Sequence, residues 1–170
     1  MTESSAKAQT PDSGVKLEVR RVIAAPRKRV FQAFSRQEEM DKWMCRDQPS
    51  HVIKYLKFDF REGGGFELDI RSASGHVYIQ RSIYLEIKPP EKIVFSWALE
   101  YIDPKRRKIP EDGHDSIVRV ELLDRGASTE VVLTHEFSAL GAKDRASYQS
   151  GWTGCLEKLA EVCEVSGAGV

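Results

Sequence analysis

The sequence predicts an α+β fold in which one long C-terminal helix lies across a curved antiparallel sheet. From about Asp144 to Cys163, apolar residues recur at alternating steps of four and three, the spacing of one helix face: Tyr148, Trp152, Cys155, Leu159 and Val162. Residues 15–137 consist mostly of short alternating segments separated by turn residues, as in an antiparallel sheet. The apolar helix face needs a partner, so we expect it to face the sheet across a shared interior space.

The composition favours one domain and excludes several classes of protein. The chain has 170 residues, with 26 basic and 26 acidic side chains, so its formal net charge is zero. This length can bury a core without disulfides or metals, and the charge balance argues against a general nucleic-acid binder. No run approaches the roughly 20 apolar residues of a membrane span, and the N-terminus lacks the apolar core of a signal peptide. We therefore expect a cytoplasmic protein.

The expected domain boundaries follow from the composition and the apolar pattern of the sequence. Residues 1–14 contain almost nothing to bury and predict a disordered tail. A single domain is expected over residues 15–165, followed by a disordered C-terminus over residues 166–170.

The first strand is expected from Val15 to Ile23, where apolar and charged residues alternate. Pro26 then suits the first turn of a short helix, and residues 36–44 predict a second short helix. The apolar residues of these two helices are Val30, Phe31, Phe34, Met40, Trp43 and Met44.

Six further alternating segments predict the rest of the sheet, at residues 51–60, 66–71, 77–87, 91–101, 117–124 and 129–137. Residues 61–65 read REGGG, but no GK[ST] follows, so we expect a hairpin turn rather than a phosphate loop. Residues 103–115 predict a charged loop. Its basic run over residues 105–108 is either solvated or a contact for nucleic acid or a protein partner.

Cysteines and histidines predict neither a disulfide nor a metal site. Cys155 and Cys163 lie eight positions apart on one expected helix, so about 12 Å separates them, too far for a bridge. The four histidines show no HxxxH or HExxH spacing, and no CxxC pair accompanies them. We expect no metal and no cofactor.

Three polar residues are expected on the inward faces of strands. His135 shares a face with Val131, Leu133 and Phe137, and is either a hydrogen-bonded structural residue or a functional one, as a ligand contact or a proton carrier. Arg21 and Arg81 also have apolar neighbours on their own faces. A buried charge needs a partner, which an anionic or carbonyl-bearing ligand could supply. The alternatives are a carboxylate partner or a bulge that turns the arginine outward.

Large aromatic side chains are spread over the expected helices and strands, where they either fill the core or line a cavity. We expect Trp97 and Trp152 to face the same interior. No GxSxG, Ser-His-Asp or paired-carboxylate pattern accompanies the aromatics, so no catalytic residue is predicted. The candidate cavity residues are Trp43, Phe58, Phe66, Arg81, Phe95, Trp97, Tyr101, His135, Tyr148 and Trp152.

Five segments, taken in order, carry a resemblance to a known family. They are RRVIAAPRKRVFQAF followed by Trp43, FREGGGFELDI, YLEIKPPEKIVFSW, STEVVLTHEF and SGWTGCLEKLAE. Together they resemble the SRPBCC superfamily, with its START-like or Bet v allergen-like helix-grip fold. The most similar branch is named after the C-terminal domain of the activator of heat-shock protein 90 ATPase. The resemblance covers residues 15–165.

The resemblance implies a curved antiparallel sheet of about seven strands wrapped on a long C-terminal helix, with two short helices after the first strand. It also implies a central cavity, which members use for lipids, polyketides, hormones and toxins, sometimes with cyclase chemistry. We therefore expect binding of a small hydrophobic or amphipathic molecule without chemistry.

Two other functions stay open at this point. One is a protein-interaction module that modulates a chaperone ATPase, which would connect the chain to the stress response. The other is a cyclase-like or hydrolase-like enzyme in which His135 or Arg81 polarises a carbonyl. The ligand and the oligomeric state are left open as well, and a homodimer is compatible with the sequence.

Overall fold

The computed structural model describes residues 14–46, 48–102, 108–110, 116–138 and 142–168. In chain order its elements are β1 (Val15–Ile23), α1 (Arg27–Ser35), α2 (Gln37–Met40), β2 (Val52–Asp59), β3 (Gly65–Arg71), β4 (Val77–Lys88), β5 (Lys92–Ile102), β6 (Lys108–Pro110), β7 (Ser116–Arg125), β8 (Ser128–Phe137) and α3 (Ala142–Ala168).

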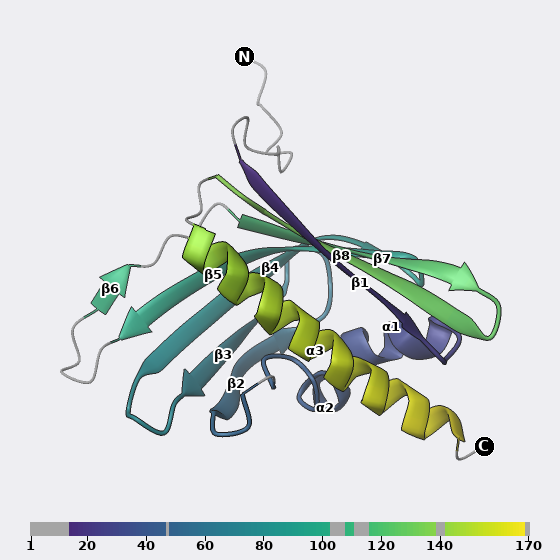
Figure 1. Ribbon diagram of the computed structural model, residues 1–170, viewed down its shortest axis with the longest axis horizontal. Coiled ribbons are helices and arrows are strands. Elements are labelled where there is room, and N and C mark those ends of the chain that lie inside the picture. The colour runs from purple at the N-terminus through teal and green to yellow at the C-terminus, as the bar shows by residue number, and fades with distance from the viewer. Residues whose placement is uncertain (1–13, 47, 103–107, 111–115, 139–141, 169–170) are drawn as a thin grey trace.

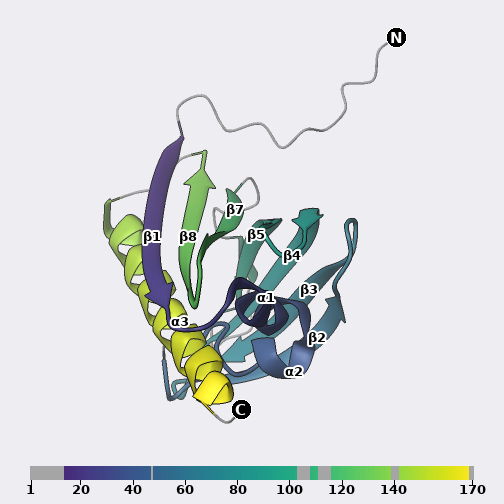
Figure 2. The same ribbon diagram turned by 90° about the vertical axis from the view of Figure 1, so that its right-hand side faces the viewer.

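Seven of these strands form one curved antiparallel sheet, and α3 runs diagonally across it (Figure 1). The strand order is β1-β8-β7-β5-β4-β3-β2, and the short β6 pairs with β5 outside this path. Figure 2 shows α1 and α2 at one end of the sheet, near the C-terminal half of α3. The predicted α+β class is confirmed, as a helix-grip fold with two short helices after the first strand.

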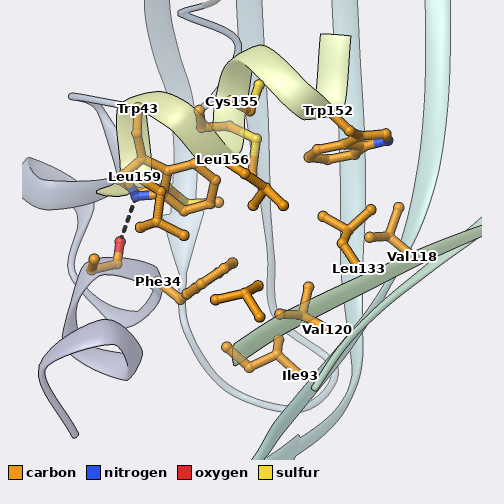
Figure 3. Close-up of a cluster of buried hydrophobic side chains, with 14 of the residues drawn as sticks. Phe34, Trp43, Ile93, Val118, Val120, Leu133, Trp152, Cys155, Leu156 and Leu159 are labelled. Carbon is orange, nitrogen blue, oxygen red and sulfur yellow. Dashed lines mark hydrogen bonds between the residues drawn. The ribbon is translucent and has the colours of Figure 1, made fainter. Parts of the chain in front are cut away.

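The apolar face of α3 is buried against the sheet, as its periodicity predicts. Trp152 is only 4% exposed, Leu159 is fully buried, and Cys155 lies between them on the same face. Figure 3 shows the buried side chains of α3 pointing toward apolar side chains of the sheet: Ile93, Val118, Val120 and Leu133. Most of the stability of such a helix comes from this packing rather than from its own propensity.

The second short helix is shorter than predicted. α2 ends at Met40, and turns replace the helix expected over residues 41–44. Trp43 and Met44 are nevertheless buried. The indole Nε1 of Trp43 donates a 2.9 Å hydrogen bond to the carbonyl oxygen of Ala33, drawn as a dashed line in Figure 3. This bond ties the turn to α1, so a turn buries the apolar residues that we assigned to a helix.

Two of the expected boundaries can be compared with the structure only in part. α3 continues to Ala168, so residues 166–168 are helical, although we expected them to be disordered. Residues 1–13 of the expected tail lie outside the described residues, as does most of the expected loop over residues 103–115. The described part of that loop, Lys108–Pro110, is the short strand β6 instead, because it pairs with the end of β5. The single domain over residues 15–165 stays a prediction.

The strand β4 presents the opposite face to the one that its apolar pattern predicts. We expected the interior to receive Val77, Ile79, Arg81, Ile83, Leu85 and Ile87. In the structure Ile83 is 53% exposed and Leu85 is 41% exposed, whereas Tyr84 between them is buried.

Neighbouring strands decide which face of β4 is buried, because residues directly opposite in an antiparallel pair lie on the same face. Tyr84 lies opposite Phe95 of β5, and Ser82 lies opposite Phe66 of β3. Phe66 and Phe95 are both buried in the core, so Ser82 and Tyr84 face the core with them. An irregularity in the register after Tyr84 then returns Ile87 to the core side.

The glycines between β2 and β3 form the predicted tight turn. Gly63 has a φ of 83°, a conformation that glycine adopts without steric cost. A Cβ atom at Gly65 would overlap the backbone carbonyl oxygen of Ser82, so glycine at this position lets β3 and β4 approach closely.

Replacing Leu159 by alanine should lower the free energy of unfolding by about 2–5 kcal/mol, because the change opens a void in a packed core. Glu157 lies on the exposed side of the same helix, and its replacement by alanine should change stability by less than about 0.5 kcal/mol. Urea denaturation followed by tryptophan fluorescence measures both values. Equal stabilities for the two variants would show that this face does not hold α3.

Candidate functional site

A cavity of about 410 Å³ lies between the N-terminal half of α3, the strands β3, β4 and β5, and the segment that follows α2. α3 contributes Asp144, Ser147, Tyr148, Gly151, Trp152 and Cys155. The sheet contributes Ile70, Tyr78, Trp97 and Leu99, and the segment before β2 contributes Cys45, Gln48 and His51.

The periodicities of the elements explain why these side chains meet. Each lining residue of α3 has another one three or four positions along the helix, so these residues form a stripe along one side of it. On the sheet, Ile70 lies directly opposite Tyr78, and Trp97 and Leu99 are two positions apart on β5, so each pair shares a face. Gln48 and Ser147 are exposed, which places the mouth of the cavity between the loop and the helix.

Cys45, Gln48 and His51, from the segment between α2 and β2, line the cavity beside α3. Cys45 has a φ of 59°, in the left-handed region that residues other than glycine rarely adopt. This conformation turns the chain between α2 and β2, where both Cys45 and His51 reach the cavity wall.

Two tryptophans from different elements meet at the inner end of the cavity. The ring centroids of Trp97 and Trp152 lie 5.1 Å apart at an interplanar angle of 62°, an edge-to-face contact. The expectation that both face the same interior is confirmed. Behind them, the indole Nε1 of Trp152 donates a 3.0 Å hydrogen bond to Nδ1 of His135.

His135 is fully buried, and its ring stacks on Phe137 with a centroid distance of 3.9 Å. Burial lowers the pKa of His135 from 6.5 to about 3, because the charged imidazolium would lose its hydration. Since Nδ1 accepts a hydrogen bond, the neutral ring carries its proton on Nε2. Of the two roles that the sequence left open, this geometry supports the hydrogen-bonded structural one.

The ten sequence candidates divide between the cavity, the core and the surface. Trp97, Tyr148 and Trp152 line the cavity, and His135 lies behind the two tryptophans. Three others, Trp43, Phe66 and Phe95, are core residues with almost no exposed surface. The last two aromatic candidates are half-buried. The ring of Phe58 contacts that of Tyr55, and the ring of Tyr101 contacts those of His76 and Tyr78.

Arg81 does not face the cavity, which corrects the expectation. Its side chain is 50% exposed on the outer face of β4, where it contacts Glu100 at 3.0 Å and Glu67 at 3.8 Å. The carboxylate partner that we considered as an alternative is therefore the one observed. Arg21 is exposed as well. Both arginines follow the rule that a charged head reaches water unless burial is compensated.

Most of the cavity wall was missed from the sequence. Asp144 and Gly151 could have been found, because they lie four and three positions from Tyr148 on a predicted helix, and Ser147 lies three positions from Asp144 and four from Gly151. Cys45, Gln48 and His51 had no such signal, since irregular segments have no periodicity from which a facing can be read.

The electrostatics of the cavity wall are simple. Among the described residues that line it, Asp144 is the one acidic side chain and none is lysine or arginine. Within the described part of the chain, no three histidine, cysteine, aspartate or glutamate side chains gather where they could hold a metal ion.

Of the helices described, none is long and apolar enough to cross a membrane.

A family model described as "Activator of Hsp90 ATPase homolog 1-like protein" matches residues 24–164. The chain belongs to this family. The match agrees with the resemblance seen in the sequence and places the chain in the SRPBCC-like fold. A comparison of the sequence with curated proteins finds no match.

Several solved structures share the fold of this family member. A Rhizobium loti protein is 25% identical with a TM-score of 0.72, and the match covers 88% of this chain and 96% of that one. For a Chromobacterium violaceum protein the identity is 23%, the TM-score 0.70 and the coverage 87% and 96%. An Arthrobacter aurescens protein is 15% identical with a TM-score of 0.73 and coverage of 88% and 86%. The last two likenesses show the fold alone.

The buried His135 should make the stability of the folded protein depend on pH. Its pKa is about 3 in the folded chain and 6.5 when unfolded, so between these values the unfolded chain binds a proton that the folded chain does not. The contribution of the neutral His135 to the free energy of unfolding is complete at pH values above the unfolded pKa. It is lost as the pH falls toward the folded pKa. From pH 7 to pH 5 the native protein should lose about 2 kcal/mol more than a His135→Gln variant, whose amide can still accept from Trp152.

Urea denaturation of both proteins at a series of pH values measures this difference. Parallel pH curves for the native protein and the variant would show that His135 is not held neutral in the fold.

Proposed function

We propose that this chain is a cytoplasmic protein that binds a small hydrophobic or amphipathic molecule in the cavity beneath α3. The observation that carries the proposal is the cavity itself, at about 410 Å³ between helix and sheet. Ligand sites commonly have volumes of about 300–1,000 Å³ and mostly apolar walls with a few polar groups. The shared fold supports the proposal, since the resemblance implies that relatives use the same space for ligands.

The distribution of side chains in the cavity favours an amphipathic occupant. Trp97, Trp152 and Leu99 form an apolar inner wall, whereas Gln48 and Ser147 lie at the exposed mouth. An apolar group placed against the inner wall would gain about 25 cal/mol for each Å² removed from water. A polar group at the other end could remain hydrated at the mouth.

Binding without chemistry is the simplest activity for this arrangement. Of the two residues that we considered for polarising a carbonyl, Arg81 lies on the outer face of β4. His135 is uncharged at neutral pH, and its Nδ1 is already bonded to Trp152. A general acid or base needs a pKa near the working pH and access to the substrate, and His135 has neither in this structure.

A bulky side chain at the mouth should block the cavity without disturbing the core. Ser147 is exposed on α3 and lines the cavity, so Ser147→Trp should weaken binding of the neutral fluorescent probe N-phenyl-1-naphthylamine by about tenfold or more, through lost burial. Ser150 is exposed on the same helix but is not a lining residue. Ser150→Trp is therefore the matched control and should bind the probe like the native protein.

Probe fluorescence titrations give the dissociation constants. Absence of saturable binding to the native protein would remove the support for a ligand-binding function, and equal affinities for both variants would place the bound probe elsewhere.

A second candidate function is modulation of a chaperone ATPase, as the description of the matching family suggests. A surface observation favours this candidate: Ile83 and Leu85 are both exposed on the outer face of β4, away from the cavity. Charged side chains, including Arg81 with its partner Glu100, lie beside them. Exposed apolar residues rimmed by charges are typical of protein contact sites.

If this candidate is correct, the protein should change the ATPase rate of an Hsp90-class chaperone, and Ile83→Glu should abolish the change by placing a charge in the apolar contact. Val52 is also exposed and apolar but lies on β2, so Val52→Glu is the control and should retain the effect. A coupled ATPase assay measures the rates. An unchanged rate with the native protein would exclude this function for the chaperone tested.

A further inference from the structure

The two edges of the sheet are finished in different ways. Figure 2 shows the strands in order from β1 on the left to β2 on the right, with α3 beside β1. On the β1 edge, Arg145 of α3 donates to the backbone carbonyl oxygen of Lys16 at 3.4 Å. One turn further along the helix, Gln149 donates to that of Glu18 at 3.3 Å. The helix therefore covers this edge and satisfies part of its backbone.

The β2 edge has no such cover within the described part of the chain. Among the helices and strands described, β3 is the one that packs closely against β2. Apart from a turn at Asp59, no hydrogen bond between described residues joins the backbone of β2 to anything but β3. Alternate N–H and C=O groups of an edge strand point away from its neighbour, so β2 presents unpaired groups along this edge.

The outer face of β2 is apolar and basic. Val52 is 67% exposed and Leu56 is 49% exposed. Lys54 and Lys57 are exposed beside them, and neither forms an ion pair with any other residue of the chain. A partner strand on this side would therefore meet two free ammonium groups.

The nearest carboxylates of the sheet are already paired. Lys54 lies opposite Asp69 of β3, whose carboxylate contacts Arg71 at 2.9 Å. Glu67 lies opposite Lys57 and contacts an arginine of β4 at 3.8 Å. The positive charge of the β2 edge is therefore available to an acidic partner.

The inner face of β2 differs in character from the outer one. Ile53 lies opposite Ile70, and Tyr55 lies opposite Leu68. Both β3 residues are buried in the core, whereas Ile53 and Tyr55 are only partly buried. A strand added beside β2 would thus meet apolar side chains on its inner face and lysines on its outer face.

Protection against aggregation explains only part of this edge. Lysines, and a register irregularity such as the one beside Leu56, oppose the pairing of exposed edges. The exposed apolar groups of Val52 and Leu56 do not serve such protection. The lysines also disfavour a second copy of this chain, because pairing two β2 strands would bring like charges together.

We propose that the β2 edge binds an extended segment of a partner protein in which acidic and apolar residues alternate. The segment adds a strand to the sheet, so that its backbone pairs with β2. Its carboxylates contact Lys54 and Lys57, and its apolar side chains contact Ile53 and Tyr55. This inference goes beyond both candidate functions, because neither the cavity nor the contact at Ile83 uses the backbone of this edge.

The probe is a fluorescein-labelled nonapeptide of alternating glutamate and valine, and the control is its lysine–valine counterpart. The native protein should bind the glutamate peptide saturably. It should bind the lysine peptide about tenfold more weakly or less, because like charges at the edge repel. Fluorescence anisotropy titrations measure both dissociation constants, and equal affinities would overturn the acidic partner.

Lys54→Glu should weaken binding of the glutamate peptide about fivefold or more, because it replaces an attraction by a repulsion. Lys28→Glu is the matched control, since it makes the same change of charge at an exposed position on α1. This variant should bind the peptide like the native protein. Equal weakening by both substitutions would place the peptide elsewhere on the surface.

A second measurement tests the backbone pairing on the native protein. A strand added at an edge pairs through one of its own edges, on which either the valine or the glutamate N–H groups lie. Of two glutamate–valine peptides, one N-methylated at the valines and one at the glutamates, one should lose binding and the other should keep it. Similar affinities for the two peptides would exclude strand addition.

Failure of the native protein to bind the unmethylated glutamate peptide would overturn the inference and leave the lysines as protection of the edge alone. The proposed ligand-binding function would be unaffected, because its probe occupies the cavity beneath α3 and is titrated separately.

Discussion

The burial of one face of α3 against a curved sheet is the constraint on which the rest of this structure depends. At its C-terminal half the helix packs closely, with Leu156, Leu159 and Cys163 all buried. At its N-terminal half the side chains of the helix and the sheet do not fill the space between them, and a cavity of about 410 Å³ remains. A single helix thus holds the fold with one half and covers the candidate site with the other.

The cluster formed by Trp97, His135 and Trp152 lies where the packed half meets the cavity. Its polar atoms are only partly satisfied within the protein: Trp152 donates to His135, whereas Nε1 of Trp97 and Nε2 of His135 have no partner in the structure. Unsatisfied buried groups lower stability, and they are retained most readily where function uses them. The cluster therefore carries a cost in stability at the boundary between the packed half and the cavity.

The two candidate functions use separate surfaces of the same sheet. Ligand binding would use the concave side beneath α3, while a chaperone contact would use the outer face of β4 around Ile83 and Leu85. Because alternate residues of a strand point to opposite faces, substitutions can change one surface and leave the other intact. Membership of the family is compatible with both functions, since a shared fold alone does not decide which is used.

The sequence by itself determined the elements of this protein, and the tertiary structure decided which faces and loops form the site. Periodicity was sufficient to predict α3 and the seven long strands, because repeating apolar residues reflect the geometry of each element, but not the three-residue β6, which is too short to show a period. It misassigned β4, where Ile83 and Arg81 point outward, since the neighbouring strands set the facing through their register. Cys45, Gln48 and His51 join Trp97 and Trp152 at one cavity only when the chain folds. Such a meeting of irregular segments with distant elements leaves no local pattern in the sequence, because it depends on packing between residues far apart in the chain.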